Sequence, residues 1–143
     1  MNINDFSGAK LAVLARDHVL TLLRDNTPGI AYPGLWDLPG GAREGTENAT
    51  ECALRETFEE ASLRLVPEDI SWRRIFANPN PGGLAHWFFV ANPGWLTLPP
   101  VRLGDEGQAI RWMPVDAFLA LENVVPHLPK RLQDYLAETR AAA

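Results

Sequence analysis

The sequence predicts an α/β (α+β) fold in which a mixed β-sheet is sandwiched between α-helices. Segments of strand and helix character follow one another in the order β-β-(β)-α-β-β-β-α-α, and no low-complexity segment or linker interrupts them. The length of 143 residues and the 46% hydrophobic content suit one domain with one core. We therefore expect a single domain over residues 1–143.

The first part of the chain predicts a hairpin followed by irregular structure. Residues 10–15 and 19–23 are mostly apolar, which indicates two strands joined by a turn at 16–18. Asn, Pro and Gly mark a loop at 25–29. Residues 36–41, WDLPGG, predict a short extended piece that ends at a flexible pair of glycines.

The second part of the chain begins with the strongest helical segment, residues 46–62. Thr46 is its expected N-cap, and Glu47 is expected in its first turn. Pro114 is well placed as the first residue of a short helix over 114–121, and a last helix is expected over 129–139. Three more strands are expected between these helices, at residues 70–77, 86–91 and 108–113.

The charge balance restricts the partners. Thirteen Lys and Arg residues against eighteen Asp and Glu residues give a net charge of −5, which argues against a nucleic-acid polymer bound through its backbone. A small phosphorylated ligand remains compatible with this charge if a metal cation supplies the positive charge. The composition therefore favours a small-molecule partner.

Cysteine content and apolar patterning suggest the compartment. Cys52 is the only cysteine, which excludes an intrachain disulfide and a cysteine-rich zinc site. The N-terminus lacks the pattern of a secretory signal, and the longest apolar stretch, residues 11–23, is too short to cross a bilayer. We expect a cytoplasmic protein with no membrane partner.

The helix at 46–62 carries a concentrated negative charge. Glu56, Glu59 and Glu60 are spaced i, i+3, i+4, so they share one arc of about 100°. Their carboxylates repel one another, and only Arg55 borders the arc, which favours a bound cation; hard carboxylate oxygens suit Mg²⁺ or Mn²⁺. A solvated acidic face is the alternative on the helix alone. The residues expected to face the sheet lie opposite: Leu54, Thr57, Phe58 and Ala61.

A longer pattern decides between these alternatives. The segment GAREGTENATECALRETFEE, from Gly41 to Glu60, resembles the Nudix box G-x5-E-x7-R-E-U-x-E-E-x-G-U, in which U is a bulky apolar residue. Every charged position of the box matches at its spacing. Thr57 replaces the first bulky apolar residue, and Ser62 replaces the last glycine. Neither departure affects a charged position.

The resemblance implies a Nudix fold and hydrolysis of a nucleoside diphosphate linked to another moiety, with Mg²⁺ or Mn²⁺ as cofactor. It implies that Glu56, Glu59 and Glu60 hold metal and help to activate water. The backbone carbonyl of Gly40 matches a further metal ligand. It also implies structural and orienting roles for the flanking box residues Gly41, Glu47 and Arg55.

Candidate residues outside the box extend the resemblance to MutT-type members. Glu106 lies in a segment that resembles the one supplying a further metal-binding or catalytic glutamate; a loop acid without a role is its alternative. Asn123 resembles an asparagine that reads a purine edge, and Phe88 an aromatic near the base. Arg24 could bind a phosphate. A turn asparagine, a core aromatic and a surface arginine are the respective alternatives.

Three functions remain open from the sequence. A MutT-like nucleoside triphosphate pyrophosphohydrolase leads, because the chain is short and Glu106 and Asn123 are suitably placed. The alternative within the same class is a pyrophosphatase acting on ADP-ribose or a nucleoside-diphosphate sugar, and Pro79 lies where some ADP-ribose enzymes carry a proline. A non-catalytic nucleotide-sensing module is the alternative from another class.

Overall fold

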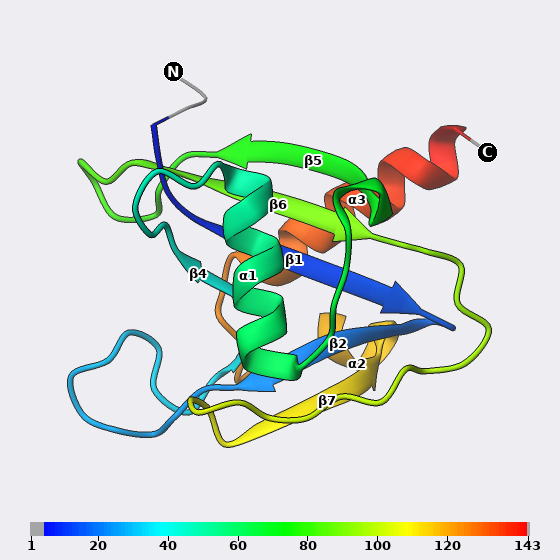
Figure 1. Cartoon of the computed structure of the whole chain (residues 1–143), viewed down its shortest axis with the longest axis horizontal. Helices are drawn as coiled ribbons and strands as arrows, with labels where there is room; N and C mark the ends of the chain where they lie inside the picture. The colour runs from blue at the N-terminus through cyan, green and yellow to red at the C-terminus, as the bar shows by residue number, and fades with distance from the viewer. Residues whose placement is uncertain (1–4, 143) are drawn as a thin grey trace.

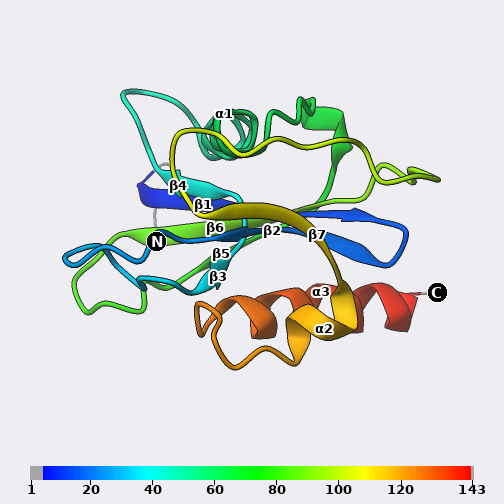
Figure 2. The ribbon, with the colours of Figure 1, turned by 90° about the horizontal axis from the view of Figure 1, so that it is seen from below.

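A seven-stranded sheet forms the centre of the computed structural model, which describes residues 5–142 (Figure 1). Helix α1 (Ala49–Ala61) covers one face of the sheet, and α2 (Val115–Leu119) and α3 (Leu128–Ala142) cover the other (Figure 2). The predicted fold class, a mixed sheet between helices, is therefore confirmed. No helix among these described residues is long and apolar enough to span a membrane.

The sheet is organised around its first strand. β1 runs parallel to β6 and antiparallel to β2 and β4, while β5 extends the sheet beyond β6, and β3 and β7 pair with β2. A single 3₁₀ turn at Pro67–Asp69 precedes β5. The strands are β1 (Phe6–Ala15), β2 (His18–Leu23), β3 (Trp36–Asp37), β4 (Gly40–Ala42), β5 (Ile70–Phe76), β6 (Ala85–Ala91) and β7 (Ala109–Pro114).

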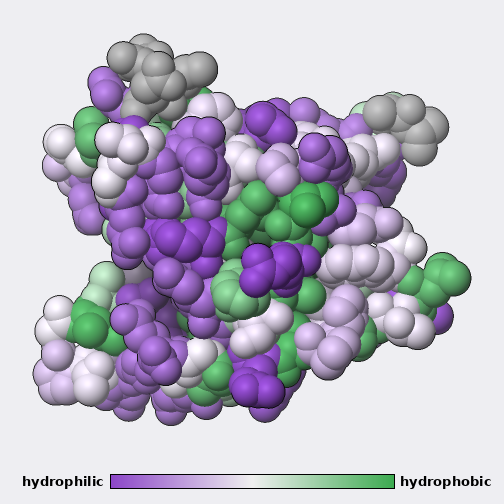
Figure 3. Space-filling view, in the orientation of Figure 1, coloured by the Kyte–Doolittle hydropathy of each residue, from purple (hydrophilic) through white to green (hydrophobic). Residues whose placement is uncertain are grey.

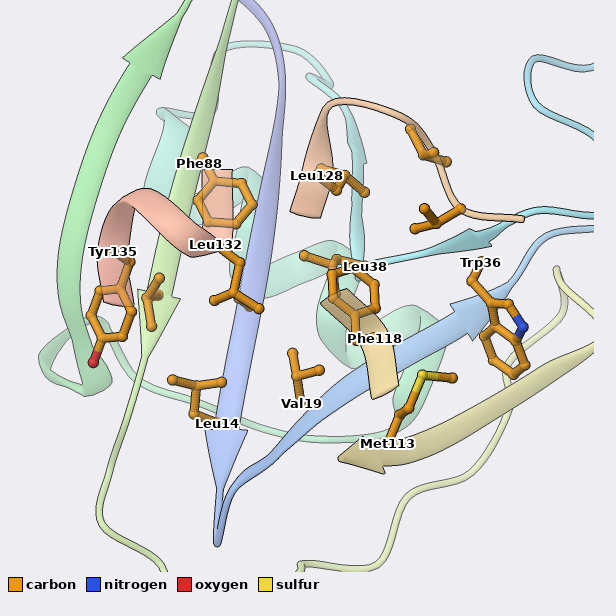
Figure 4. Close-up of a cluster of buried hydrophobic side chains, with 14 residues drawn as sticks. Leu14, Val19, Trp36, Leu38, Phe88, Met113, Phe118, Leu128, Leu132 and Tyr135 are labelled. Atoms are coloured by element: carbon orange, nitrogen blue, oxygen red, sulfur yellow. The ribbon is translucent and has the colours of Figure 1, made fainter. Parts of the chain in front are cut away.

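The core lies in two layers because residues of β1 alternate between the two faces of the sheet. Leu11 and Val13 pack with Ala53 on the side of α1. Leu14 packs on the opposite side with Phe118 of α2 and the α3 side chains (Figure 4). Both layers are closed to solvent, so the sheet is a rigid support for the loops at its edge.

Several element boundaries differ from the expectations: α2 spans Val115–Leu119 rather than 114–121, and α3 spans Leu128–Ala142 rather than 129–139. β1 begins at Phe6, not at Lys10, because residues 6–10 pair with β4 and β6 although Gly8 and Ala9 have little strand preference. The main helix begins at Ala49 and its N-cap is Asn48, so the expected cap at Thr46 is wrong. Asn48 and Glu51 form a capping box, which satisfies the first helical N–H groups more completely.

The predicted buried side of the helix is also partly wrong. Thr57 and Ala61 are buried as expected, together with Cys52 and Ala53, but Phe58 is 43% exposed. The buried side consists of small residues, which let the helix approach β1 and β4 closely. Phe58 lies outside, under the guanidinium of Arg64. On this face of the molecule an apolar area lies among hydrophilic side chains (Figure 3).

Candidate active site

Two glycines bring the β4 loop into direct contact with the carboxylates of α1. The Gly40 N–H donates to Glu60 Oε1 at 2.8 Å. A Cβ added to Gly41 would lie 2.8 Å from the carboxyl carbon of Glu56, so the Glu56 carboxylate packs directly against the backbone of Gly41. At Gly40, with φ of 138°, a Cβ would lie 2.1 Å from the Ala9 carbonyl oxygen. Only glycine fits this close crossing of backbone.

Arg55 joins the acidic residues into one array. Its Nη2 and Nε donate to the two oxygens of Glu47 at 2.8 and 2.9 Å. Its Nη1 donates to Glu56 at 3.0 Å and to Glu59 at 3.1 Å, and Nη2 also donates to the Ala42 carbonyl. Glu47 lies outside the helix, before its N-cap, and therefore reaches Arg55 from the loop.

The carboxylates of the array differ in pKa because their surroundings differ. The Arg55 guanidinium lowers the pKa of Glu47 to about 2. Burial raises the pKa of Glu60 to about 8, although the Lys10 charge and the Gly40 N–H oppose that shift. Burial also raises the pKa of Glu56. The two carboxylates nearest the glycines are therefore short of compensating positive charge.

The donor set fits a hard divalent cation. Glu56, Glu59 and Glu60 each use one oxygen in the bonds given above, which leaves the other for a ligand. The described residues contain no preassembled cluster of three side chains at metal-binding distance. The acidic array is thus chemically suited to Mg²⁺ or Mn²⁺. The Gly40 carbonyl, which accepts from Lys10 Nζ at 3.2 Å, lies beside it.

A second loop places Glu106 next to the same helix. The Gly104 N–H donates to the Glu60 carbonyl at 3.1 Å, and the Gly107 N–H donates to Asp25 Oδ2 at 3.0 Å. A Cβ on Gly104 would lie 2.0 Å from the Glu59 carbonyl oxygen, so the loop depends on this glycine. Glu106 and Glu60 consequently line one cavity of about 240 Å³.

A buried ion-pair network supports the glycine loop. Two of its members, Lys10 and Asp37, were not predicted as site residues from the sequence. Asp37 is 1% exposed and accepts from Lys10 Nζ and Arg24 Nη1, each at 2.9 Å. The sequence feature that indicates a buried charge is the position of Asp37 between two apolar residues, Trp36 and Leu38. Arg24, a candidate phosphate ligand, is thus ion-paired with Asp37 while still lining the cavity of Glu106.

The other two substrate candidates line neither the cavity of Glu106 nor the one beside Gly41. Phe88 is fully buried among the core side chains (Figure 4). Its ring packs edge-on against Trp72 and Phe76. Its burial argues against a direct contact with a base. The Asn123 carbonyl accepts from the Trp36 N–H at 2.9 Å, and the residue is exposed to solvent. Its position suits a turn residue.

A larger cavity adjoins the glycine loop on the side of α3. It has a volume of about 330 Å³ and reaches from Gly41 and Lys10 to two histidines, His86 and His127. The His127 ring lies 6.3 Å from that of His86 and 6.2 Å from that of Tyr32, centroid to centroid. These residues share no local motif, because strand β6 and two separate loops contribute them.

Residues 7–135 match the NUDIX domain family. This match covers most of the chain and includes the glycine loop, the acidic helix and the Glu106 loop described above. The chain therefore belongs to the Nudix family.

Individual relatives agree with this membership. A "Nucleoside triphosphate pyrophosphatase/Nudix hydrolase fusion protein" of Bifidobacterium longum is 38% identical over 87 residues, 60% of this chain and 17% of the relative. The "Putative 8-oxo-dGTP diphosphatase 3" of Mycobacterium tuberculosis is 33% identical over 101 residues, 67% of this chain and 42% of the relative. This chain thus spans less than half of either relative.

The fold is shared with solved structures. A bifunctional NMN adenylyltransferase/ADP ribose pyrophosphatase from Francisella tularensis, complexed with AMP and a manganese ion, superimposes with a TM-score of 0.78. It is 22% identical, and the alignment covers 94% of this chain and 42% of that protein.

Proposed function

We propose that this chain is a MutT-like nucleoside triphosphate pyrophosphohydrolase that depends on Mg²⁺ or Mn²⁺. The observation that carries the proposal is the Arg55-centred array, which holds Glu47, Glu56 and Glu59 while Glu60 is fixed by the Gly40 N–H. A binding module would need neither the buried Glu60 carboxylate nor this set of ion pairs. The relatives named above support hydrolysis of a nucleotide.

The residues of the site have different roles because their environments differ. Arg55 orients the Glu56 and Glu59 carboxylates through one nitrogen, Nη1. Burial raises the pKa of the Glu60 carboxyl to about 8 in the metal-free chain, so a cation bound there would displace a proton. A divalent cation, held by Glu56, Glu59 and Glu60 with the Gly40 carbonyl and Glu106 nearby, would neutralise phosphate charge and make water more acidic.

The test is product identification with a panel of nucleotides. The purified chain is incubated with Mg²⁺ and nucleoside triphosphates, ADP-ribose or nucleoside-diphosphate sugars, and the products are separated by chromatography. The proposal predicts a nucleoside monophosphate and pyrophosphate from a triphosphate. Faster turnover of ADP-ribose or of a nucleotide sugar would favour the second activity of the same site, and binding without turnover of any nucleotide would identify a sensing module.

A further inference from the structure

The loop that carries Glu106 is held by hydrogen bonds of its backbone on both sides of this residue. On one side the Gly104 N–H donates to the Glu60 carbonyl at 3.1 Å. On the other side the Gly107 N–H donates to Asp25 Oδ2 at 3.0 Å. The Glu106 side chain is exposed, and no ion pair in the described part of the chain includes it. The position of the Glu106 carboxylate therefore depends on these two anchors.

The anchor at Gly107 belongs to a set of three hydrogen bonds that join the end of β2 to the start of β7. The Leu23 carbonyl accepts from the Gln108 N–H at 2.7 Å, and the Arg24 carbonyl accepts from Gln108 Nε2 at 2.8 Å. Asp25 completes the set with its side chain rather than with its carbonyl. The bond that lies nearest Glu106 is thus one that a side-chain substitution can remove.

Both partners of this bond are fixed in place. The Asp25 carbonyl accepts from the Gly34 N–H at 2.8 Å, which holds the backbone of Asp25. Gly107 has φ of 94°, and a Cβ there would lie 2.7 Å from Leu22 Cδ1 and 3.1 Å from the Leu23 carbonyl oxygen. Glycine is therefore required to bring this N–H so close to the end of β2.

The charge of Asp25 does not explain its position. Asp25 lines the cavity of about 240 Å³ together with Glu60 and Glu106, which places three carboxylates around one small space. The Arg24 guanidinium lines the same cavity but is already paired with a different carboxylate. Because like charges repel, a third carboxylate is unfavourable here in the metal-free chain. The acceptor that Asp25 offers to the Gly107 N–H is therefore the feature that accounts for it.

We propose that Asp25 is a positioning residue, whose side chain fixes the backbone at Gly107 and so keeps the Glu106 carboxylate on the cavity wall that it shares with Glu60. The inference rests on the proposed function, since Asp25 acts only through Glu106. Asparagine offers an equivalent acceptor oxygen, so this role requires the hydrogen bond and not the negative charge.

The test is a double-mutant cycle between Asp25 and Glu106, read as kcat and KM for a nucleoside triphosphate with Mg²⁺. Asp25→Ala should lower kcat by about tenfold or more and change KM by less than about threefold, because a misplaced group costs rate rather than binding. The same substitution in the Glu106→Gln background should have no further effect. Asp25→Asn should rescue the loss. Asp105→Ala, at an exposed acid of the same loop, is the matched control and should behave like the wild type.

Three results would overturn the assignment. Additive losses in the double variant would mean that Asp25 acts independently of Glu106. An equal loss in Asp25→Asn and Asp25→Ala would mean that the charge is needed rather than the hydrogen bond. Wild-type kcat in Asp25→Ala or in Glu106→Gln would leave nothing for Asp25 to position. Melting temperatures show whether each variant is folded, and Asp25→Ser, whose hydroxyl is shorter, replaces Asp25→Ala if that variant is not.

A result without any turnover is decided by metal binding. If no nucleotide is hydrolysed, the proposed function fails, and calorimetry with Mn²⁺ tests the positioning role alone. Glu106→Gln and Asp25→Ala should then weaken Mn²⁺ binding by the same factor, with no further loss in the double variant, while Asp25→Asn should bind like the wild type. Mn²⁺ affinity that Asp25→Ala leaves unchanged, or that Asp25→Asn lowers equally, would refute the role.

Discussion

Arg55 and Glu47 form a two-point ion pair, with Nη2–Oε1 at 2.8 Å and Nε–Oε2 at 2.9 Å. This pair ties the loop before α1 to the middle of the helix. It leaves Nη1 free to hold Glu56 and Glu59. The orientation of two candidate metal ligands thus depends on a residue outside the helix that carries them.

The Arg55–Glu47 pair predicts a specific loss of stability in Glu47→Gln. Because the folded-state pKa of Glu47 is lowered to about 2 from an ordinary value of 4.5, its carboxylate stabilises the fold fully above pH 4.5. That contribution disappears as the pH falls through 2. Glu47→Gln should therefore be less stable by about 1.5–3 kcal/mol at pH 7, and the difference should shrink towards zero in acid. Urea unfolding at several pH values measures it; a pH-independent difference would contradict it.

The raised pKa of Glu60 predicts that the stability of the metal-free protein has the opposite pH dependence. Its folded-state pKa of about 8 lies above the ordinary 4.5, so the folded state binds the extra proton between these values. Stability from this group is present below pH 4.5 and is lost as the pH rises through 8. In chelator at pH 9, Glu60→Gln should be more stable than the wild type by at least about 1.4 kcal/mol, the equivalent of one pKa unit. A less stable variant at pH 9 would show that Glu60 is compensated in the apo protein.

Substitution of Gly40 or Gly41 by alanine should affect the stability and the activity of the protein to different extents. Gly41→Ala would place its Cβ against the mobile end of Glu56, so we expect a tenfold or larger loss of kcat with less than about 1 kcal/mol loss of stability. Gly40→Ala would collide with the Ala9 backbone at a positive φ and should lower stability by more than about 2 kcal/mol. Thermal unfolding and initial rates of both variants test this contrast, and equal unfolding of the two would contradict it.

Ser62 ends α1 in the left-handed conformation, with φ of 55° and ψ of 29°. The box pattern has glycine here, which adopts that conformation without strain. Ser62→Gly should therefore stabilise the protein by about 0.5–1 kcal/mol without changing kcat. Ser62→Ala keeps the Cβ and serves as the control. A Ser62→Gly variant no more stable than Ser62→Ala would show that the strain is relieved elsewhere.

Local patterns predicted the parts of the site that lie within one segment. The spacing of Glu56, Glu59 and Glu60 was sufficient to place them on one helix, and the two glycines marked the loop that meets them. The sequence could not show that Glu47 lies outside the helix, since both Thr46 and Asn48 are acceptable caps.

The cavity that reaches from Gly41 to His127 could not be predicted because its residues come from distant segments. Tyr32, His86 and His127 share no motif, and each is compatible with an ordinary surface or core position on its own. Strand β6 and two separate loops bring their rings together, and that contact exists only in three dimensions.

The most direct test of the central claim is the rate of pyrophosphate release from a nucleoside triphosphate. It is measured with Mg²⁺ and in excess chelator for the wild type, Glu60→Gln and Glu51→Gln. Glu51 belongs to the same helix but serves the capping box, which glutamine can maintain. We predict that wild-type activity disappears in chelator and returns with Mg²⁺, that Glu60→Gln loses about a hundredfold or more in kcat, and that Glu51→Gln stays close to wild type. Full activity in chelator, or equal losses in the two variants, would contradict the account.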